Sequence, residues 1–547
     1  MAKEHSGKSN SILVQGSILA AASLMVRFIG LIYRVPMRAI LGPEAIGYYG
    51  SAYEFYNLAL ILSSYSLPLA VSKLVSARRV QGQHRNARKV FILALTFGAV
   101  VGAIGTCVCH FGAYWYGAYI DQPGAVLPLQ VLAPTILVFS VMGVIRGYFQ
   151  GYNNMVPTAI SQVIEQIINA GVSVGAAYWL MQKYAGTDLQ LTKGAAGGTF
   201  GTFMGAEAAL LTLLIVYFMH RKVFQKLIAI EKENASESET ERPIHILKLL
   251  VLTVVPVIVS QTVYQISGMI DNVVFNRVLL GRGYSASLRA EWWGIYTNEY
   301  KLLTNVPVAI ASAMGTAIVP GLVAVYVKGH KDQLREKVAS AVKFNMIIAF
   351  PCAAGMAVLS GPILRMLWGI TGTLNRNILQ LGSVAIIVFA LSTLTNGILQ
   401  GINHLSIPVL HSAIALVIHV IALEILLQFT NLDVYALMIC NVLFGLVVSI
   451  LNWISIGHYL AYKQEIKTTF IIPFIASAFM GISCRCLYDC LFLYTNVTIS
   501  CVGAILCAVP VYFAALILLK GVSKEELLNM PKGHILVKIL TKCRLLR

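Results

Sequence analysis

The chain has 547 residues, of which 57% are hydrophobic and only 12% are charged, whereas a typical soluble domain is about 25% charged. This composition excludes a water-soluble globular protein. The 41 Lys and Arg residues outnumber the 23 Asp and Glu residues, which gives a net charge of +18. In a soluble protein such an excess would suggest a nucleic-acid partner, but in a membrane protein the charges must first be placed relative to the bilayer.

Apolar stretches long enough to cross a bilayer occur along almost the whole sequence. A hydrocarbon core about 30 Å thick requires about 20 apolar residues in a helix. We therefore predict an all-α polytopic membrane protein with fourteen transmembrane helices, which begin near residues 11, 52, 90, 127, 157, 195, 249, 302, 338, 378, 408, 434, 469 and 499. An even number of spans places both termini on the same side of the membrane.

The basic residues indicate which side that is. It carries Lys73 to Lys89, with six basic and no acidic residues, and Lys520 to Arg547, with seven basic and two acidic residues. The positive-inside rule therefore predicts that both termini are cytoplasmic. Attraction of these segments to anionic lipid accounts for most of the net charge. We predict membrane lipids, and no nucleic acid, as partners.

One long hydrophilic connection divides the chain. It runs from His220 to Lys248 and contains the low-complexity segment Glu231 to Arg242 (EKENASESETER), whose composition predicts a flexible cytoplasmic linker. The predicted domains are an N-terminal six-helix lobe (1–222), the linker (223–248), a C-terminal six-helix lobe (249–467), two additional helices (468–519) and a basic cytoplasmic tail (520–547).

Two short motifs repeat between the lobes. The sequence GYFQGYN at 147–153 recurs 250 residues later as GILQGIN at 397–403, and RAILG at 38–42 recurs 239 residues later as RVLLG at 277–281. These offsets drift in one direction, as expected after a single duplication with small insertions. We therefore predict two parallel six-helix pseudosymmetric repeats, an arrangement that places a substrate cavity between the halves.

Ionisable side chains within the spans are the functional candidates, because the sequence lacks nucleotide-binding and hydrolase motifs and we predict no enzyme. Each such charge costs at least about 2.5 kcal/mol at the bilayer centre unless it faces a cavity or a partner. Arg27, Arg34 and Arg38 have spacings of seven and four residues, so a helix would carry them on one face. Guanidinium groups there suit a phosphate or pyrophosphate ligand, although snorkelling to headgroups would also explain Arg38. Glu424 and Arg485 are interpreted as members of structural ion pairs.

Two acidic residues are candidates for gating or cation coupling. Asp271 lies in a polar stretch of the seventh span, where it could bind a coupling cation or form a salt bridge to an arginine of the first span, and Glu165 has the same two interpretations. We predict no cofactor apart from this unidentified cation. We also predict no metal site, because Cys484, Cys486 and Cys490 lie among apolar neighbours, with Asp489 as the one further ligand at suitable spacing.

A family resemblance rests on RFIGLIYRVP (27–36), LGPEAIGYY (41–49), SLPLAVSK (66–73), GYFQG (147–151) with SQVIEQ (161–166), and the pattern of Pro307, Gly315, Thr316 and Pro320. With these motifs the chain resembles the polysaccharide-biosynthesis branch of the multidrug/oligosaccharidyl-lipid/polysaccharide exporter superfamily. That branch contains stage V sporulation protein B and the MurJ-like lipid II flippases.

The resemblance implies two six-helix repeats and two C-terminal helices that form a groove for a polyprenyl tail. It implies a cationic cavity for a pyrophosphate head group, to which Arg27, Arg34 and, at the start of the eighth span, Lys301 would contribute. The second span lacks the arginine that the family carries there. The implied function is transfer of an undecaprenyl-pyrophosphate-linked glycan, with lipid II as first candidate, from the inner to the outer leaflet of the bacterial plasma membrane. We expect alternating access by a monomer.

Three alternatives stay open. The same mechanism could export another lipid-linked polysaccharide unit or a spore-cortex precursor. A cation-coupled drug antiporter is the second alternative, against which the two extra helices and the cationic cavity argue. A membrane glycosyltransferase or ligase is the third, and it would require an outer loop with catalytic carboxylates, whereas Asp121, Asp188 and Asp433 each stand alone in short predicted loops.

Overall fold

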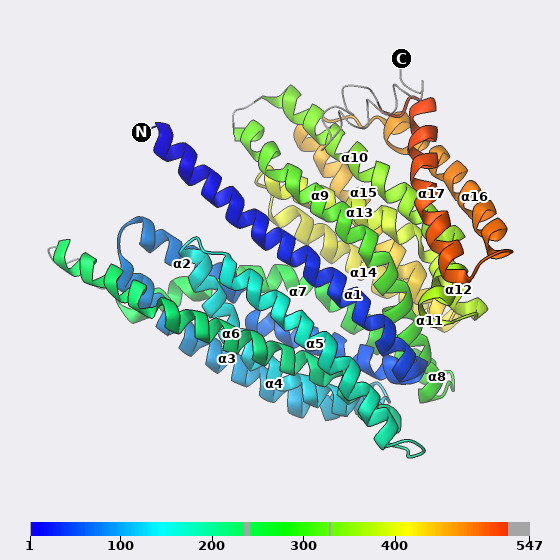
Figure 1. Ribbon diagram of the computed structural model, residues 1–547, viewed down its shortest axis with the longest axis horizontal. Coiled ribbons are helices and arrows are strands. Elements are labelled where there is room, and N and C mark those ends of the chain that lie inside the picture. The colour runs from blue at the N-terminus through cyan, green and yellow to red at the C-terminus, as the bar shows by residue number, and fades with distance from the viewer. Residues whose placement is uncertain (1, 235–240, 328–329, 523–547) are drawn as a thin grey trace. The chain divides into compact units, whose positions relative to one another are not determined.

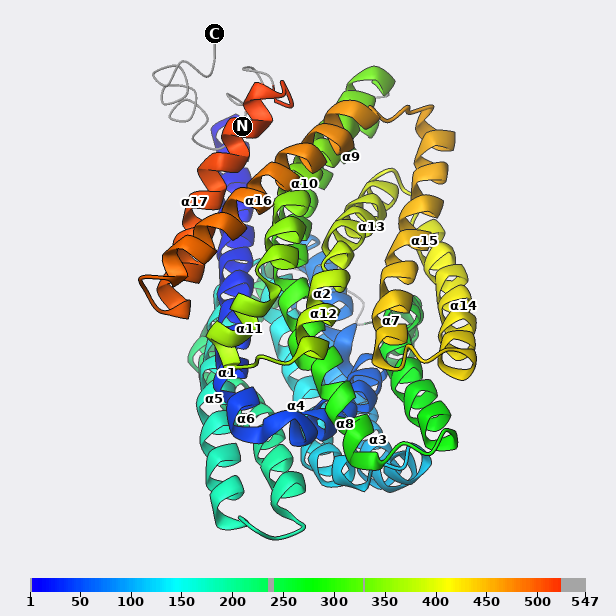
Figure 2. The same cartoon turned by 90° about the vertical axis from the view of Figure 1, so that its right-hand side faces the viewer.

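The computed structural model of the protein describes residues 2–234, 241–327 and 330–522, and all regular elements among them are helices (Figures 1 and 2). Eleven candidate spans in this part of the chain are long and apolar enough to cross a membrane. The composition-based prediction of a polytopic helical membrane protein is therefore confirmed. The chain divides into two compact units, residues 1–294 and 295–547.

The first unit contains α1 (Ala2–Leu60), the π-helical segment η1 (Ile61–Tyr65), α2 (Leu67–Val80), α3 (His84–Tyr119), the short 3₁₀ turn η2 (Pro123–Ala125), α4 (Val126–Gly151), α5 (Val156–Lys183), α6 (Gln190–Asn234), α7 (Pro243–Gly281) and α8 (Ala286–Gly294). α5 and α6 form an antiparallel pair, as do α3 and α4 (Figure 1). The interior between α2, α3, α4 and α6 is apolar, with Val71, Val90, Met142 and Leu213 fully enclosed.

α1 changes direction at Gly42, which has φ 73° and ψ 179°. Only glycine adopts this conformation without strain, and Pro43 disfavours a helical conformation for the residue before it. α1 thus joins two apolar stretches, which the candidate span Ala21–Val80 includes as one. The prediction of fourteen spans is therefore neither confirmed nor excluded by a count of eleven.

The second unit contains the π-helical segment η3 (Ile295–Lys301), α9 (Leu302–Val327), α10 (Lys331–Val358), α11 (Ser360–Trp368), α12 (Thr373–Gly382), α13 (Val384–Gly401), α14 (Ser406–Phe429), α15 (Val434–Leu460), the π-helical segment η4 (Lys467–Ile471), α16 (Ile472–Phe492) and α17 (Val497–Leu518). α16 and α17 form a hairpin that packs on α10 through a core with Ile347, Ala476 and Met480 (Figure 2). The Tyr512 hydroxyl donates to the Ile347 carbonyl at 2.8 Å. The two helices are therefore integral to the second unit.

The predicted linker differs from the structure at both ends. α6 continues to Asn234 and α7 begins at Pro243, while residues 235–240 lie outside the described residues. Glu231 is buried and accepts a hydrogen bond from the Arg85 amide at 2.7 Å. The segment predicted as a flexible linker is therefore held at both ends, because Glu231 contacts the start of α3 and Glu241 accepts hydrogen bonds from Arg78 of α2. The predicted tail lies outside the described residues from 523 onward.

The compact units do not coincide with the predicted lobes, because α7 and α8 belong to the first unit. α8 crosses the part of α1 that follows Gly42 with almost no space between the backbones. A Cβ added at Gly47 would lie 1.8 Å from the Ala290 carbonyl oxygen, and one at Gly294 would lie 2.6 Å from the Pro43 carbonyl oxygen. Each glycine thus faces the carbonyl four residues before the other one. This reciprocal contact requires glycine on both helices.

A tyrosine pair follows each of these glycines at the same spacing. Tyr49 and Tyr53 have ring centroids 4.6 Å apart, and Tyr296 and Tyr300 have centroids 5.7 Å apart. This G-x-Y-x-x-x-Y repeat was not among the predicted repeat motifs. The helices of the repeated GYFQGYN and GILQGIN motifs also end alike, since the asparagine at 153 has φ 61° and that at 403 has φ 67°. These local matches are in register with the proposed duplication, whereas the six-helix repeat as a whole stays a prediction.

Candidate functional site

The three arginines of α1 lie in different surroundings although their spacing places them on one helical face. Arg27 is exposed, Arg34 is partly buried and Arg38 is buried. Packing of α1 becomes continuous from Tyr33 onward, which explains this gradient. Within the described part of the chain, no side chain forms an ion pair or a hydrogen bond with Arg27. Its charge is therefore available to a ligand or to lipid headgroups.

Arg34 lies among aromatic hydroxyls. It interacts electrostatically with Tyr33, Tyr49 and Tyr53, and the hydroxyls of Tyr33 and Tyr49 are 3.5 Å apart. Tyr53 also hydrogen-bonds through its hydroxyl to Thr202 of α6. These contacts orient the guanidinium without neutralising it, since the described residues provide no carboxylate for it.

Glu165 does form an ion pair, but with a residue that sequence analysis did not consider. Arg146 of α4 donates from Nη2 to the Glu165 carboxylate at 2.9 Å and from Nε to the Ser161 hydroxyl at 3.0 Å. The two charged side chains are only 10% and 15% exposed. The proposed partner, an arginine of the first span, is thus replaced by Arg146, which immediately precedes the repeated GYFQG motif. A gating role for Glu165 stays a prediction.

Asp271 lies in the polar interface between α7 and α1, with only 2% of its surface exposed. The neighbouring Asn272 donates to the Ser51 hydroxyl at 3.0 Å. One turn earlier, a Cβ added at Gly268 would lie 2.2 Å from the Glu54 carboxylate, so this carboxylate rests directly on α7. The interface thus contains two acidic side chains from facing helices. Cation coupling at Asp271 stays a prediction.

The remaining predicted charges belong to the second unit. Lys301 ends η3 and has its ammonium group 4.7 Å from the centroid of the Tyr296 ring. Arg485 pairs with Asp489, one turn further along α16, at 2.9 Å. Glu424 accepts a hydrogen bond from its own helix rather than from Arg485. The structure therefore brings Arg27, Arg34 and Arg38 together on α1, while Lys301 lies in the other unit.

A buried arginine of α8 was also missed. Arg289 has no exposed surface, and its Nη2 lies 2.6 Å from the Asp121 carboxylate. Its Nη1 donates to the Ile120 carbonyl at 3.1 Å and to the Asn276 carbonyl at 3.2 Å, and Nε donates to the Tyr284 carbonyl at 3.2 Å. Asp121, which stands alone in the sequence, is therefore engaged. Its partner is 168 residues away, so no local spacing could have revealed the pair.

The described residues contain no group of three or more His, Cys, Asp or Glu side chains that could hold a metal ion. Cys484 is buried, and its thiol donates to the Ala504 carbonyl at 3.5 Å. Cys486 and Cys490 are exposed. The three thiols thus do not converge on one point.

In the described part of the chain all regular elements are helices, and its eleven candidate spans define a multi-pass membrane protein. Residues 12–325 match the family described as polysaccharide biosynthesis protein. The chain belongs to this family.

Individual relatives agree with this assignment. The lipid II flippase MurJ of Bacillus subtilis (strain 168) is 26% identical over 494 residues, which cover 87% of this chain and 88% of the relative. Stage V sporulation protein B of the same organism is 21% identical over 521 residues, with 94% and 96% covered. A solved structure of lipid II flippase MurJ in an inward closed conformation matches with a TM-score of 0.63 at 14% identity, covering 91% of this chain and 97% of that one. These relatives support a membrane flippase or exporter and not an enzyme.

Proposed function

We propose that the protein is a flippase that moves an undecaprenyl-pyrophosphate-linked glycan, with lipid II as first candidate, from the inner to the outer leaflet by alternating access. It acts as a monomer in the bacterial plasma membrane with both termini in the cytoplasm. Fourteen spans, two six-helix repeats and the α16–α17 hairpin make up the transporter. The 26% identity with the lipid II flippase over most of both chains supports this substrate class.

The observation that carries the proposal is the exposed guanidinium of Arg27 on an apolar helix. An unpaired charge within a span is costly unless it faces a cavity, water or an anionic group. A guanidinium keeps its charge in such surroundings and binds phosphate oxygens in a bidentate manner. Arg34 and Arg38 continue the same face, and Lys301 completes the proposed set for the pyrophosphate.

The acidic residues have a separate role in the proposal. Asp271 and Glu165 gate the conformational change or couple it to a cation, because Asp271 is buried and Glu165 is partly buried on helices that contact α1 or α4. The substrate's polyprenyl tail follows the hairpin of α16 and α17. Both helices expose large apolar side chains along their length, among them Phe474, Phe479, Ile482 and Leu506.

Complementation of a depletion strain tests the substrate site. We expect Arg27→Ala to abolish growth rescue although the variant is present in the membrane in normal amounts. Arg27→Lys should rescue in part, because lysine keeps the positive charge but not the bidentate guanidinium group. Arg221→Ala removes an exposed arginine of α6 and serves as the matched control. Full rescue by Arg27→Ala would mean that Arg27 only snorkels to headgroups, and would contradict the proposal.

The substrate itself is tested by identifying the lipid-linked precursor that accumulates on the inner leaflet after depletion. Accumulation of lipid II supports the first candidate. A second candidate is export of another lipid-linked unit or a spore-cortex precursor, which the similarity to stage V sporulation protein B over 94% of the chain favours. Accumulation of such a precursor with normal lipid II turnover would select this second candidate.

A further inference from the structure

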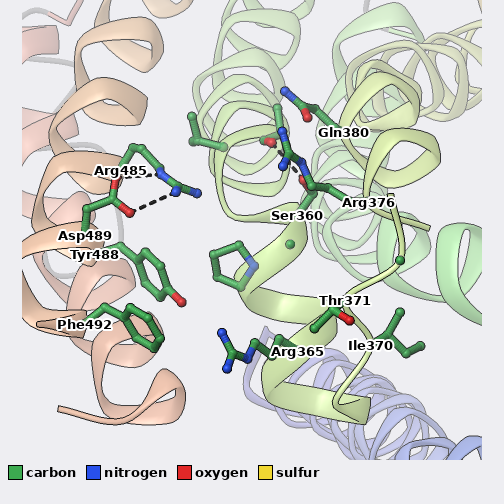
Figure 3. Close-up of a pocket in the computed structure, with 15 residues that line it drawn as sticks. Ser360, Arg365, Ile370, Thr371, Arg376, Gln380, Arg485, Tyr488, Asp489 and Phe492 are labelled. Atoms are coloured by element: carbon green, nitrogen blue, oxygen red, sulfur yellow. Dashed lines mark hydrogen bonds and ion pairs between the residues drawn. The ribbon is translucent and has the colours of Figure 1, made fainter. Parts of the chain in front are cut away.

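A polar cavity lies beside α16 in the second unit, and none of the residues proposed for the pyrophosphate or for gating lines it. Its volume is about 480 Å³, within the range of ligand pockets. Arg485, Tyr488 and Phe492 project into it from α16, and Arg365 and Arg376 approach from α11 and α12 on the opposite side (Figure 3). Three arginines from three helices thus line one cavity.

The charges in this cavity do not balance. Asp489 is its one acidic lining residue, and Arg485 occupies that carboxylate with Nε and Nη2, each at 2.9 Å. Within the described part of the chain, neither Arg365 nor Arg376 forms an ion pair. Arg365 instead lies over the Phe492 ring at 5.5 Å from its centroid. Two positive charges are therefore left without a counterion.

The start of α12 adds to the positive potential. Thr371 and Gly372 line the cavity, and α12 begins at the next residue with neither an acidic residue in its first turn nor a side-chain cap on its amides. The N-terminal end of a helix carries a partial positive charge, which favours an anion. The helix end and the two arginines thus favour the same sign of ligand.

Part of the cavity wall is apolar. The Tyr488 and Phe492 rings stack with centroids 5.6 Å apart, and Pro362 and Ile370 also line the cavity. On the outer face of α16, Phe479 and Ile482 are exposed and suited to contact with lipid. Basic and aromatic side chains together at the end of an apolar helix are typical of the membrane interface. An occupant with a phosphate group and a hydrocarbon chain fits both the polar and the apolar walls.

We infer that this cavity binds the phosphate or pyrophosphate group of a membrane lipid. Arg365 and Arg376 contact the phosphate oxygens, the α12 N-terminus adds its dipole, and Tyr488 and Phe492 pack against the first carbons of the chain. In the orientation proposed above, the site faces the outer leaflet. Lipid binding here does not depend on which glycan the protein transports, or on transport at all.

Asp489 sets the strength of the site. Its carboxylate forms an ion pair with Arg485 and places a negative charge at the edge of the cavity. Removal of that charge frees a third guanidinium for the ligand. The proposal therefore predicts a gain of binding for one substitution and a loss for another, a pattern that a purely structural role would not produce.

Native mass spectrometry of the purified full-length protein tests this. The probes are phosphatidylglycerol, undecaprenyl phosphate and zwitterionic phosphatidylcholine, with inorganic pyrophosphate as a soluble competitor. We expect the Arg365→Gln/Arg376→Gln variant to bind both anionic lipids about tenfold or more weakly, because two charge-assisted contacts are lost. We expect Asp489→Asn to bind them more tightly than wild type, and phosphatidylcholine binding to change in neither variant.

The matched control is Arg277→Gln/Arg221→Gln, which removes two exposed arginines of the first unit that have no acidic partner among the described residues. Its binding should equal that of wild type, and all variants should keep the wild-type Tm. Equal loss of binding in the control would show a nonspecific charge effect and overturn the proposal. Unchanged binding in Arg365→Gln/Arg376→Gln would also overturn it. Displacement by pyrophosphate at concentrations as low as those of the lipids would mean that the ligand is a free phosphate.

Discussion

Arginines in the interior of the first unit and arginines in the cavity beside α16 differ in burial and in ion pairing. In the first unit Arg289 and Arg146 are almost fully buried, and each has a carboxylate within 2.9 Å and further oxygen acceptors around it. Beside α16, Arg365 and Arg376 are exposed, and the described residues leave both without a carboxylate. Burial with full pairing marks an arginine that supports the fold. Exposure without pairing marks one that is available to a ligand.

The largest expected effect concerns Arg289. Its guanidinium joins the loop after α3 to the end of α7 and to α8, and Arg289→Met would remove the donors that it supplies to the buried carbonyls of Ile120, Asn276 and Tyr284. We expect a loss of about 3–5 kcal/mol, because each unsatisfied buried acceptor costs about 1–3 kcal/mol. The measurement is the Tm of the purified protein in detergent, with the yield of monodisperse protein as a second readout.

Arg277→Met is the control for this change. Arg277 is exposed and lies over the Tyr119 ring at 4.9 Å, so its removal should alter stability by no more than about 0.5 kcal/mol. If both variants unfolded at the wild-type Tm, burial and pairing would not distinguish the two kinds of arginine. The comparison above would then lose its physical basis.

Breaking the ion pair between Arg146 and Glu165 is expected to have an effect of similar size. Either Arg146→Met or Glu165→Leu leaves one buried charge unpaired, which costs about 3–5 kcal/mol. The double variant Arg146→Met/Glu165→Leu should recover most of this loss, because no charge is left behind. A double-mutant cycle in Tm measures the coupling.

Transport by the stable double variant then shows whether Glu165 only forms a structural ion pair or also acts in gating or cation coupling. If it rescues a depletion strain, the pair supports the fold and Glu165 does not couple transport to a cation. If it inserts normally and fails to rescue, one of the two charges acts in transport. Additive losses in the single variants would contradict the ion pair itself.

Which features could be predicted from the sequence depends on how far apart in the chain the interacting residues lie. A helical multi-pass membrane protein was predictable, because long apolar stretches are required to cross a bilayer, while the number of fourteen spans stays a prediction. The shared face of Arg27, Arg34 and Arg38 followed from helical periodicity. Their different exposure did not, because it depends on where neighbouring helices begin to pack against α1. The reciprocal crossing at Gly47 and Gly294 left a sequence signal, a glycine followed by two tyrosines, that is recognisable only once the contact is known.

The partners of the buried charged residues could not be predicted either, because they lie far apart in the sequence. Arg289 and Asp121 are 168 residues apart, and Arg78 and Glu241 are 163 apart. No helical or strand period joins residues at such distances. The composition of the segment around Glu241 indicated a flexible linker. Composition could not show that the buried Arg78 forms an ion pair with the Glu241 carboxylate.

The smallest expected effect is the pH dependence of that last pair, which lies outside the spans. Arg78 donates from Nε and Nη2 to the two oxygens of Glu241, at 2.7 and 2.5 Å, and these bonds lower the pKa of Glu241 below its ordinary value of 4.5 despite partial burial. A lowered carboxylate pKa stabilises the folded state above the ordinary pKa, and this contribution disappears as the pH falls through the folded-state pKa.

We expect Glu241→Gln to be less stable than wild type at pH 7 by about 1 kcal/mol. The effect is this small because water still reaches the carboxylate and screens its charge. The difference in Tm between the two proteins should shrink below about pH 4.5. The His245 ring also lies 3.6 Å from this carboxylate, so both proteins are also measured with His245→Gln. A difference in Tm that stays constant down to the acid limit would show that Glu241 supports this turn through shape alone, and not through its charge.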